Sequence, residues 1–115
     1  MDRLTALYEA LRRRDAAGLT AQCAPGVDWP DAITGGRVVG REAVAAFWAA
    51  QWDVIDLDLH PRLMRQLPDG RVEVLVDQVV RDADGDLLSE AVVLHTYTFD
   101  AAGLVIRMDV GDPAI

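Results

Sequence analysis

The chain contains no lysine and no asparagine, and serine and cysteine each occur only once, as Ser89 and Cys23. The absence of lysine excludes Schiff-base chemistry and the phosphate-binding loop that depends on a lysine. A single cysteine excludes an intrachain disulfide and a zinc site built from several cysteines. Because an isolated cysteine packs as a small hydrophobe more often than it reacts, we interpret Cys23 as a core residue.

Long apolar runs are also missing, since no stretch approaches the roughly 20 residues that cross a bilayer. The chain opens directly into a helical pattern rather than a signal peptide, so we expect a cytoplasmic protein without a membrane partner. Its net charge of −8 argues against a nucleic-acid partner, because phosphate backbones need clustered cations. The one basic cluster, residues 12–14, ends a predicted helix and complements its dipole.

What is present fits one globular domain over residues 1–115, with 51% hydrophobic and 26% charged residues. Apolar residues at helical spacing predict helices over residues 2–14, 16–23 and 40–52. From residue 54 the apolar pattern changes to period two. It predicts four strands separated by glycine-containing turns, over residues 54–67, 71–81, 87–99 and 104–110. Helices followed by long antiparallel strands indicate an α+β fold, with the helices on one face of a curved sheet.

Several motifs along this order of elements resemble the SnoaL-like branch of the nuclear transport factor 2-like superfamily. They are a first helix followed by Arg-Asp at 14–15, a short helix, Val-Asp-Trp at 27–29, a helix start Gly-Arg-Glu-Ala-Val at 40–44, and a closing hairpin over 97–107. The resemblance implies a cone-shaped fold of about three N-terminal helices on a curved, mostly antiparallel sheet that encloses an apolar pocket. It also implies a homodimer formed through the outer face of the sheet.

Members of that superfamily include polyketide cyclases, ketosteroid isomerases, dehydratases, epoxide hydrolases and non-catalytic binding modules, so the fold alone does not decide the function. Aligning Phe99 and Gly103 with the closing hairpin of the ketosteroid isomerases places His95 where those enzymes carry an acidic oxyanion-hole donor. Because this chain has an imidazole there, the resemblance does not transfer isomerase activity.

His95 lies in the most apolar predicted strand, where its imidazole needs a hydrogen-bond partner or a cavity. A three-residue turn at 101–103, with Gly103 left-handed, would place His95 opposite Asp109 and Tyr97 opposite Arg107. A four-residue turn would instead place His95 opposite Met108 and bring Asp112 to its face. The glycine position favours the first register and the apolar residues of the last strand favour the second; we adopt the first as the working hypothesis.

The preceding hairpin has the same ambiguity. A two-residue Asp84-Gly85 turn would put Gln78 and its neighbouring valines on the face of His95, whereas a three-residue turn would put Asp77 there. Because Asp-Gly is the stronger turn signal, Gln78 is the candidate ligand-binding residue on this strand and Asp77 is the reserve.

A His95–Asp109 pair in an apolar pocket would suit general acid-base catalysis, since the carboxylate fixes the tautomer of the imidazole. Tyr97 would donate to a developing oxyanion, and Arg107 would complete a polar face. Trp29, Trp48 and Trp52 are core residues or the wall of a pocket for a flat, hydrophobic ligand.

No cofactor is implied, because the chain lacks a glycine-rich dinucleotide motif, and its two histidines do not form a metal-binding motif. Three hypotheses follow, and the sequence leaves open whether the protein is an enzyme. The first is a small lyase, isomerase or cyclase that uses His95 and Asp109 on a hydrophobic carbonyl compound, in a pocket of several hundred cubic ångströms. The second is a binding module for a small apolar molecule, and the third is a dimeric interaction domain.

Overall fold

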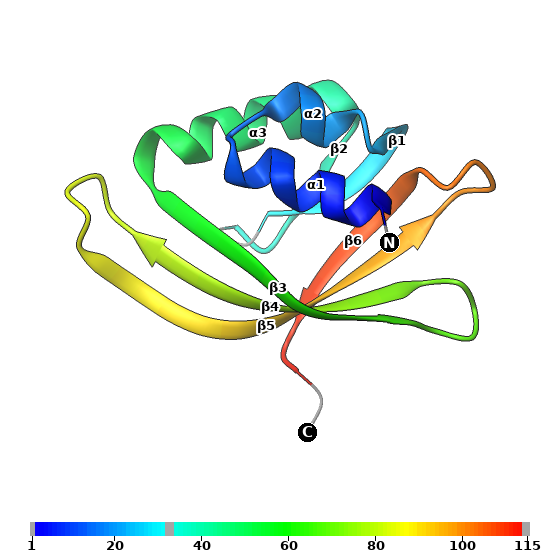
Figure 1. Ribbon diagram of the computed structural model, residues 1–115. Helices are drawn as coiled ribbons and strands as arrows, with labels where there is room; N and C mark the ends of the chain where they lie inside the picture. The colour runs from blue at the N-terminus through cyan, green and yellow to red at the C-terminus, as the bar shows by residue number, and fades with distance from the viewer. Residues whose placement is uncertain (1, 32–33, 114–115) are drawn as a thin grey trace.

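The computed structural model describes residues 2–31 and 34–113, and over these it has three helices packed on one face of a strongly curved sheet (Figure 1). The helices are α1 (Asp2–Arg12), α2 (Ala16–Thr20) and α3 (Arg41–Val54). The predicted α+β architecture is therefore confirmed. The predicted second helix is too long, because the chain after residue 22 enters a strand.

Within the described residues, the sheet has six strands in the order β2-β1-β6-β5-β4-β3. They are β1 (Cys23–Pro30), β2 (Arg37–Val39), β3 (Asp56–Gln66), β4 (Val72–Arg81), β5 (Leu87–Phe99) and β6 (Val105–Gly111). All neighbouring strands are antiparallel except β1 and β6, which are parallel. Only the last four of these strands were predicted from the sequence.

Three hairpins connect β3 to β6, and all three turns have one design. Each turn has three residues, and the third is a glycine with positive φ. The residues before and after the turn are joined by a backbone hydrogen bond. In the last hairpin, for example, Asp100 N–H donates to the Leu104 carbonyl at 2.9 Å, and Gly103 has φ of 83°. A left-handed glycine at the third turn position is what this type of loop requires.

Each hairpin also contains one extra residue in a β-bulge, which shifts the pairing beyond it by one position. The extra residues are Arg62 in β3, Leu88 in β5 and Ile106 in β6. Because alternate residues of a strand face opposite sides of the sheet, these bulges decide which side chains meet the helices.

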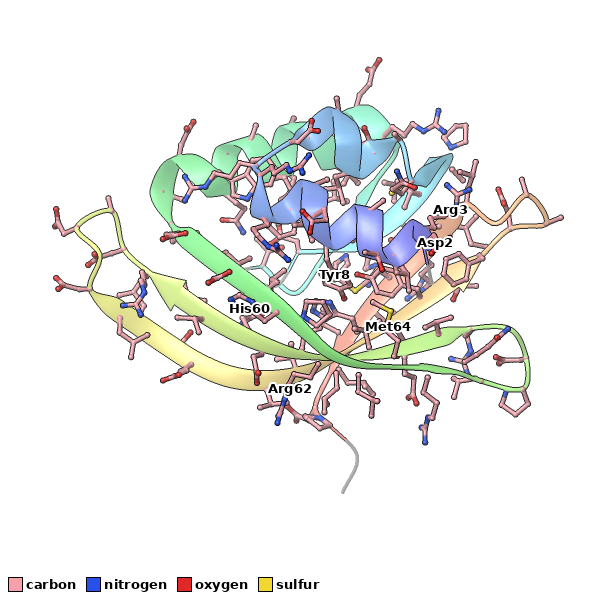
Figure 2. The ribbon with its side chains drawn as sticks, in the orientation of Figure 1. Asp2, Arg3, Tyr8, His60, Arg62 and Met64 are labelled. Atoms are coloured by element: carbon pink, nitrogen blue, oxygen red, sulfur yellow. The ribbon has the colours of Figure 1, made fainter. Side chains whose placement is uncertain are left out.

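The core lies between the helices and the concave face of the sheet. The apolar stripe of α1, with Leu4, Leu7 and Leu11, packs onto the sheet together with Val44 and Trp48 of α3. Figure 2 shows Tyr8 pointing from α1 toward the sheet, whereas Arg62 lies on the opposite, outer side. Cys23 is fully buried, which confirms its interpretation as a core residue.

Candidate functional site

His95 lies on the concave face of the sheet and is only 3% exposed. Its strand neighbours on that face are Val74 of β4 and Val110 of β6. An imidazole between two valines has no polar partner within the sheet, so its hydrogen bonds must come from the helix layer or from the space between the layers.

The helix layer supplies one partner, Tyr8 of α1. Its hydroxyl lies 2.8 Å from Nδ1 of His95, and the two rings stack at 6.0 Å between centroids. The Tyr97 hydroxyl in turn donates to the Tyr8 oxygen at 2.9 Å. We call this chain of buried side chains, Tyr97–Tyr8–His95, the tyrosine relay.

We assign the tautomer of His95 from the direction of the tyrosine relay. Since Tyr97 donates to the Tyr8 oxygen, the Tyr8 proton goes to Nδ1 of His95, and the imidazole proton is assigned to Nε2. Nε2 has no hydrogen-bond partner among the described residues. His95 therefore offers one free N–H donor.

Burial keeps this relay uncharged. Desolvation lowers the pKa of His95 from 6.5 to about 4, so the imidazole is neutral at pH 7. Burial likewise raises the pKa of both tyrosines above the usual value of 10, and their hydroxyls stay protonated. A neutral donor with a fixed direction suits hydrogen bonding to an oxygen acceptor better than proton abstraction.

His95 lines a cavity of about 70 Å³ between the sheet and α3. Its other lining residues are all uncharged: Leu11, Trp29, Pro30, Phe47, Trp48, Gln51, Leu57, Leu59, Gln78, Met108 and Val110. The expected volume of several hundred cubic ångströms was wrong, because the indole rings of α3 and β1 fill much of the space between the layers. A site of this size takes about two water molecules or one polar group with its nearest atoms.

Two further buried polar side chains at this cavity lack partners. The indole Nε1 of Trp48 is enclosed and forms no hydrogen bond with the described residues. One turn later on α3, the Gln51 side chain is 9% exposed, and its amide forms no hydrogen bond with them either. Buried polar groups are nearly always paired, so these side chains make the cavity the candidate functional site.

Asp109 does not belong to this site. It pairs with Thr96, whereas His95 pairs with Val110, so the carboxylate and the imidazole lie on opposite faces of the sheet. The predicted three-residue turn with left-handed Gly103 is present, but the Ile106 bulge adds one residue and moves Asp109 outward. The prediction that Asp109 faces His95 was therefore wrong. The alternative register, with His95 opposite Met108, is absent too, and Asp112 lies exposed beyond the end of β6.

Arg107 was also misplaced by the prediction, since it pairs with Thr98 and not with Tyr97. On the outer face it binds Asp109 at 2.9 Å and Asp28 at 3.1 Å. Arg37 binds the same two carboxylates, at 3.3 Å and 2.7 Å respectively. The hydrogen bond from Arg107 lowers the pKa of Asp109, with help from the charge of Arg37. These four residues join β6, β1 and β2 as a structural ion network.

Three other candidate site residues come together at the cavity. Gln78, Trp29 and Trp48 all line the cavity beside His95, and Asp77 lies on the outer face, where Arg62 pairs with it at 3.4 Å. Gln78 reaches the correct face for a different reason from the expected one. The turn has three residues, and the Leu88 bulge restores the register that a two-residue turn would give.

Tyr97 and Trp52 form a second layer around the site. Tyr97 is fully buried and acts on His95 through Tyr8. Trp52 packs against Trp48 at 5.6 Å between ring centroids but is not among the lining residues. His60 is exposed and pairs with Asp58 at 2.9 Å.

The sequence did not single out Tyr8 or Gln51 as site residues. Tyr8 lies within the first predicted helix, over residues 2–14. A signal was present, because a tyrosine hydroxyl on a buried stripe needs a hydrogen-bond partner. No comparable pattern marked Gln51, whose position three residues after Trp48 places it on the same side of α3.

In the described part of the chain, no group of three or more histidine, cysteine, aspartate or glutamate side chains is arranged to hold a metal ion. Within the same residues, no helix is both long and apolar enough to cross a membrane.

The sequence profile of the SnoaL-like domain matches residues 4–112. None of the curated proteins compared with the chain matches it. Many solved structures do, and one of the most similar is a nuclear transport factor 2-like protein of unknown function from Burkholderia pseudomallei K96243. That structure is 27% identical, with a TM-score of 0.83 over 98% of this chain and 89% of its own.

Two other similar structures contain bound small molecules. TerC, co-crystallised with polyporic acid, is 25% identical with a TM-score of 0.82, over 97% of this chain and 89% of its own. A Mycobacterium tuberculosis protein in complex with estradiol-17β-hemisuccinate is 20% identical with a TM-score of 0.79, over 92% of this chain and 87% of its own. At that identity the second likeness shows the fold alone.

Proposed function

Because this chain belongs to the SnoaL-like domain family, we propose that its cavity binds a small, largely apolar carbonyl compound through a hydrogen bond from Nε2 of His95. One observation carries the proposal. The Tyr8 hydroxyl occupies Nδ1 at 2.8 Å, which leaves Nε2–H of a buried imidazole without a partner among the described residues beside a cavity.

The lining of the cavity supports a neutral ligand. All of its described lining residues are uncharged, so an ionised group placed there would lose its hydration without gaining a counter-charge. Aromatic and aliphatic walls with a few polar groups are typical of sites for small organic molecules. Such a lining favours a ligand that combines an apolar skeleton with a hydrogen-bond acceptor.

The same geometry favours binding over acid-base catalysis. A general base needs a pKa near the working pH, whereas burial holds that of His95 at about 4. Asp109, the predicted partner, is on the other face of the sheet. We therefore rank the binding module above the lyase, isomerase or cyclase with a His95–Asp109 pair.

The small cavity receives the carbonyl end of a ligand, and the rest extends past the rim. The rim includes Phe47, Gln78 and Val110, which are partly exposed; Val110 is 42% exposed. Larger molecules bind to proteins of similar fold, since TerC was crystallised with polyporic acid and the mycobacterial protein with a steroid hemisuccinate. Ring movements at the rim would be needed for molecules of that size here.

The test is a titration with acetophenone, followed in ¹H–¹⁵N spectra of the labelled protein. We expect saturable shifts of residues around the cavity, with weaker binding in His95→Phe because the donor is lost. His60→Phe is the matched control, since it removes the exposed histidine and leaves the cavity intact. Absence of saturable binding to the wild type, or equal affinity in His95→Phe, contradicts the proposal.

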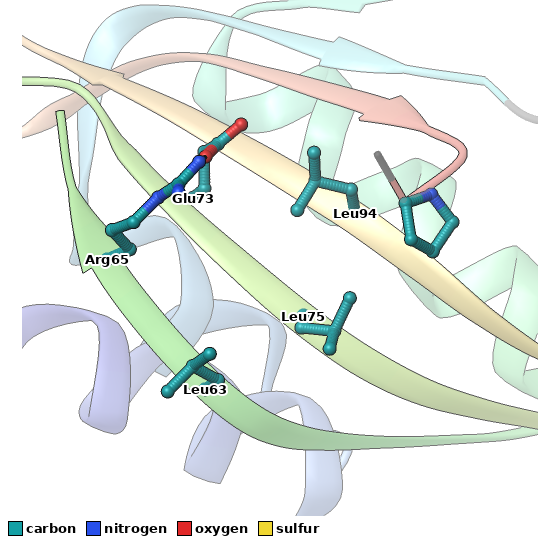
Figure 3. Close-up of a pocket in the computed structure, with 6 residues that line it drawn as sticks. Leu63, Arg65, Glu73, Leu75 and Leu94 are labelled. Carbon is teal, nitrogen blue, oxygen red and sulfur yellow. Dashed lines mark hydrogen bonds and ion pairs between the residues drawn. The ribbon is translucent and has the colours of Figure 1, made fainter. Parts of the chain in front are cut away.

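A second proposal concerns the outer face of the sheet, where we infer that two copies of the chain pack together. Leu63, Leu75 and Leu94 come from adjacent strands β3, β4 and β5 and form an apolar row there (Figure 3). Leu63 is 64% exposed, and the row borders a shallow depression of about 180 Å³. A Glu73–Arg65 ion pair lies at its edge. An apolar centre with a charged rim is typical of a protein interface, and the same row on both copies suits two-fold symmetry.

A further inference from the structure

We infer that the side-chain amide of Gln51 is a second polar contact of the ligand, and that the cavity takes a hydroxy ketone. The hydroxyl pairs with the Gln51 amide, and the carbonyl oxygen accepts from Nε2 of His95. This inference rests on the proposed function and narrows the class of its ligand.

The first support is that the Gln51 amide has no partner. The side chain is 9% exposed, so it is largely removed from bulk water. Neither its oxygen nor its nitrogen forms a hydrogen bond with the described residues. A primary amide presents one acceptor and two donor hydrogens, and buried groups of this kind are nearly always paired. The whole hydrogen-bonding capacity of this side chain is therefore available to a bound molecule.

The second support is that the amide can be reached. In the described part of the chain, only one unpaired side-chain nitrogen or oxygen outside the exposed residues is completely enclosed, namely Nε1 of Trp48. The unpaired amide atoms of Gln51 and Nε2 of His95 therefore both keep surface that a water-sized atom can touch. Both side chains line the cavity of about 70 Å³, and both are otherwise buried.

The position of Gln51 on α3 explains this access. Phe47 and Trp48 lie four and three residues before it, and at this helical spacing all three side chains line the cavity. The amide thus comes from the helix layer, whereas the imidazole of His95 comes from the sheet. Gln78 lines the cavity as well, but it is partly exposed and can pair with water. Gln51 is therefore the amide that most needs a partner from the ligand.

The chemistry of the two groups indicates a hydroxyl beside a carbonyl. In the assigned tautomer, Nε2–H of His95 only donates, and a carbonyl oxygen is its natural acceptor. The Gln51 amide both donates and accepts, and a hydroxyl does the same with a single heavy atom. The uncharged lining disfavours an ionised group in its place. Because so small a cavity holds few atoms, the carbonyl and the hydroxyl belong on neighbouring carbons.

The experiment compares phenacyl alcohol with propiophenone, which carries a methyl group where phenacyl alcohol carries its hydroxyl. The quantity of interest is the dissociation constant of propiophenone divided by that of phenacyl alcohol. Gln51→Met keeps the length of the side chain but has no amide, and it should lower this ratio at least about tenfold, the effect of roughly 1.4 kcal/mol. The different hydration of the two probes cancels, because it is the same for wild type and variant.

Two further variants complete the comparison. Gln66→Met makes the same chemical change at an exposed glutamine at the end of β3 and should leave the ratio unchanged. His95→Phe should weaken both probes by a similar factor and also keep the ratio, because both probes carry the carbonyl group.

A spectroscopic reading accompanies the affinities. The chain has four glutamines and no asparagine, so its ¹H–¹⁵N spectrum has four pairs of side-chain amide signals, and the pair lost in Gln51→Met is that of Gln51. Phenacyl alcohol should shift this pair clearly more than propiophenone does, because only its hydroxyl can bond to the amide.

The outcomes separate the two proposals. If both probes bind and are weakened by His95→Phe, but Gln51→Met keeps the wild-type ratio, Gln51 is not a contact and the proposed function stands. Equal shifts of the Gln51 signals with both probes, or a similar fall of the ratio in Gln66→Met, would also overturn the role of Gln51. If neither probe binds the wild type, both proposals fail.

Discussion

Tyr8 and His95 are 87 positions apart in the chain, and the hydroxyl of one lies 2.8 Å from Nδ1 of the other. Their rings are nearly parallel, with 10° between planes. This contact joins the first helix to the strand at the centre of the concave face. The same hydrogen bond that helps to dock α1 on the sheet therefore also orients the imidazole of the candidate site.

Replacing Tyr8 by phenylalanine should affect both the stability of the protein and the tautomer of His95. The substitution leaves Nδ1 of His95 and the Tyr97 hydroxyl buried without their partner, and we expect a loss of about 1–3 kcal/mol in the free energy of unfolding. Without the Tyr8 proton at Nδ1, the Nδ1–H tautomer should become populated. Urea denaturation measures the first effect, and long-range ¹H–¹⁵N correlation through the imidazole carbons measures the second.

A companion variant is Tyr97→Phe, which removes the donor at the other end of the tyrosine relay but leaves the Tyr8–His95 contact in place. The Tyr8 oxygen can then accept from Nδ1–H of His95, so we expect the Nδ1–H tautomer to become populated here too. A wild-type protein already in the Nδ1–H form, or an unchanged tautomer in Tyr8→Phe, would show that the relay does not set the direction of the donor.

The burial of His95 makes the stability of the fold depend on pH in a definite window. The folded-state pKa is lowered to about 4, whereas an unfolded histidine titrates near 6.5. Between these values the unfolded chain binds more protons, so stability falls as the pH is lowered through the window. The contribution of His95 is complete above pH 6.5, and we expect a loss of about 2 kcal/mol by pH 5 and about 3 kcal/mol by pH 4.

Carboxylates titrate in the lower part of this window, so the measurement is a difference between variants. The free energy of unfolding is determined at pH 7, 5 and 4 for the wild type, His95→Phe and His60→Phe. The first variant should show a shallower fall than the wild type by about the amounts above. The second should follow the wild type, because exposed His60 lies outside the core. Parallel curves for the wild type and His95→Phe would mean that His95 is not held neutral by the fold.

The sequence predicted the layers of this fold well because they follow from local patterns. Helical spacing marked the buried stripe of α1, and alternation marked β3 to β6. Which side chains of a strand face the helices was harder to predict, because this depends on single extra residues in β-bulges. Leu88 and Ile106 both form bulges, yet no residue type or turn pattern distinguishes either from its neighbours. In one hairpin the bulge brought Gln78 to the expected face, and in the other it carried Asp109 away.

For the candidate site, the sequence identified individual residues but not their partners. His95 and the tryptophans were identified from residue type, because a polar or very large side chain in an apolar element needs an explanation. The partner of His95 was not, since it lies in α1 and no local rule relates residue 8 to residue 95. Strand-pairing rules favoured Asp109 on the neighbouring strand, whereas packing of the helix layer supplied Tyr8.

Gly103 should be the least replaceable glycine of the closing hairpin. Its φ of 83° is strained for any residue with a Cβ, so Gly103→Ala should cost about 1–2 kcal/mol in unfolding free energy. Gly26→Ala in β1 is the control: a Cβ there meets no atom within 4 Å and the φ is not positive, so little change is expected. Urea denaturation of the two variants tests this, and equal stabilities would contradict the assigned turn.

The outer face of the sheet provides the last prediction, which concerns the proposed dimer. Light scattering after size-exclusion chromatography at low micromolar concentration should give twice the chain mass of 12.6 kDa for the wild type. Leu63→Arg places a charge in the centre of the leucine row and should give the mass of one chain, because burying an uncompensated guanidinium opposes association.

The matched control is Val54→Arg at the end of α3, where the side chain is 62% exposed compared with 64% for Leu63. A Val54→Arg variant that remains dimeric beside a monomeric Leu63→Arg variant assigns the interface to the leucine row, whereas a wild-type mass of one chain removes the dimer altogether. The proposed interface and the candidate site share two strands, because β4 and β5 carry Leu75 and Leu94 on the outer face and Gln78 and His95 on the inner one.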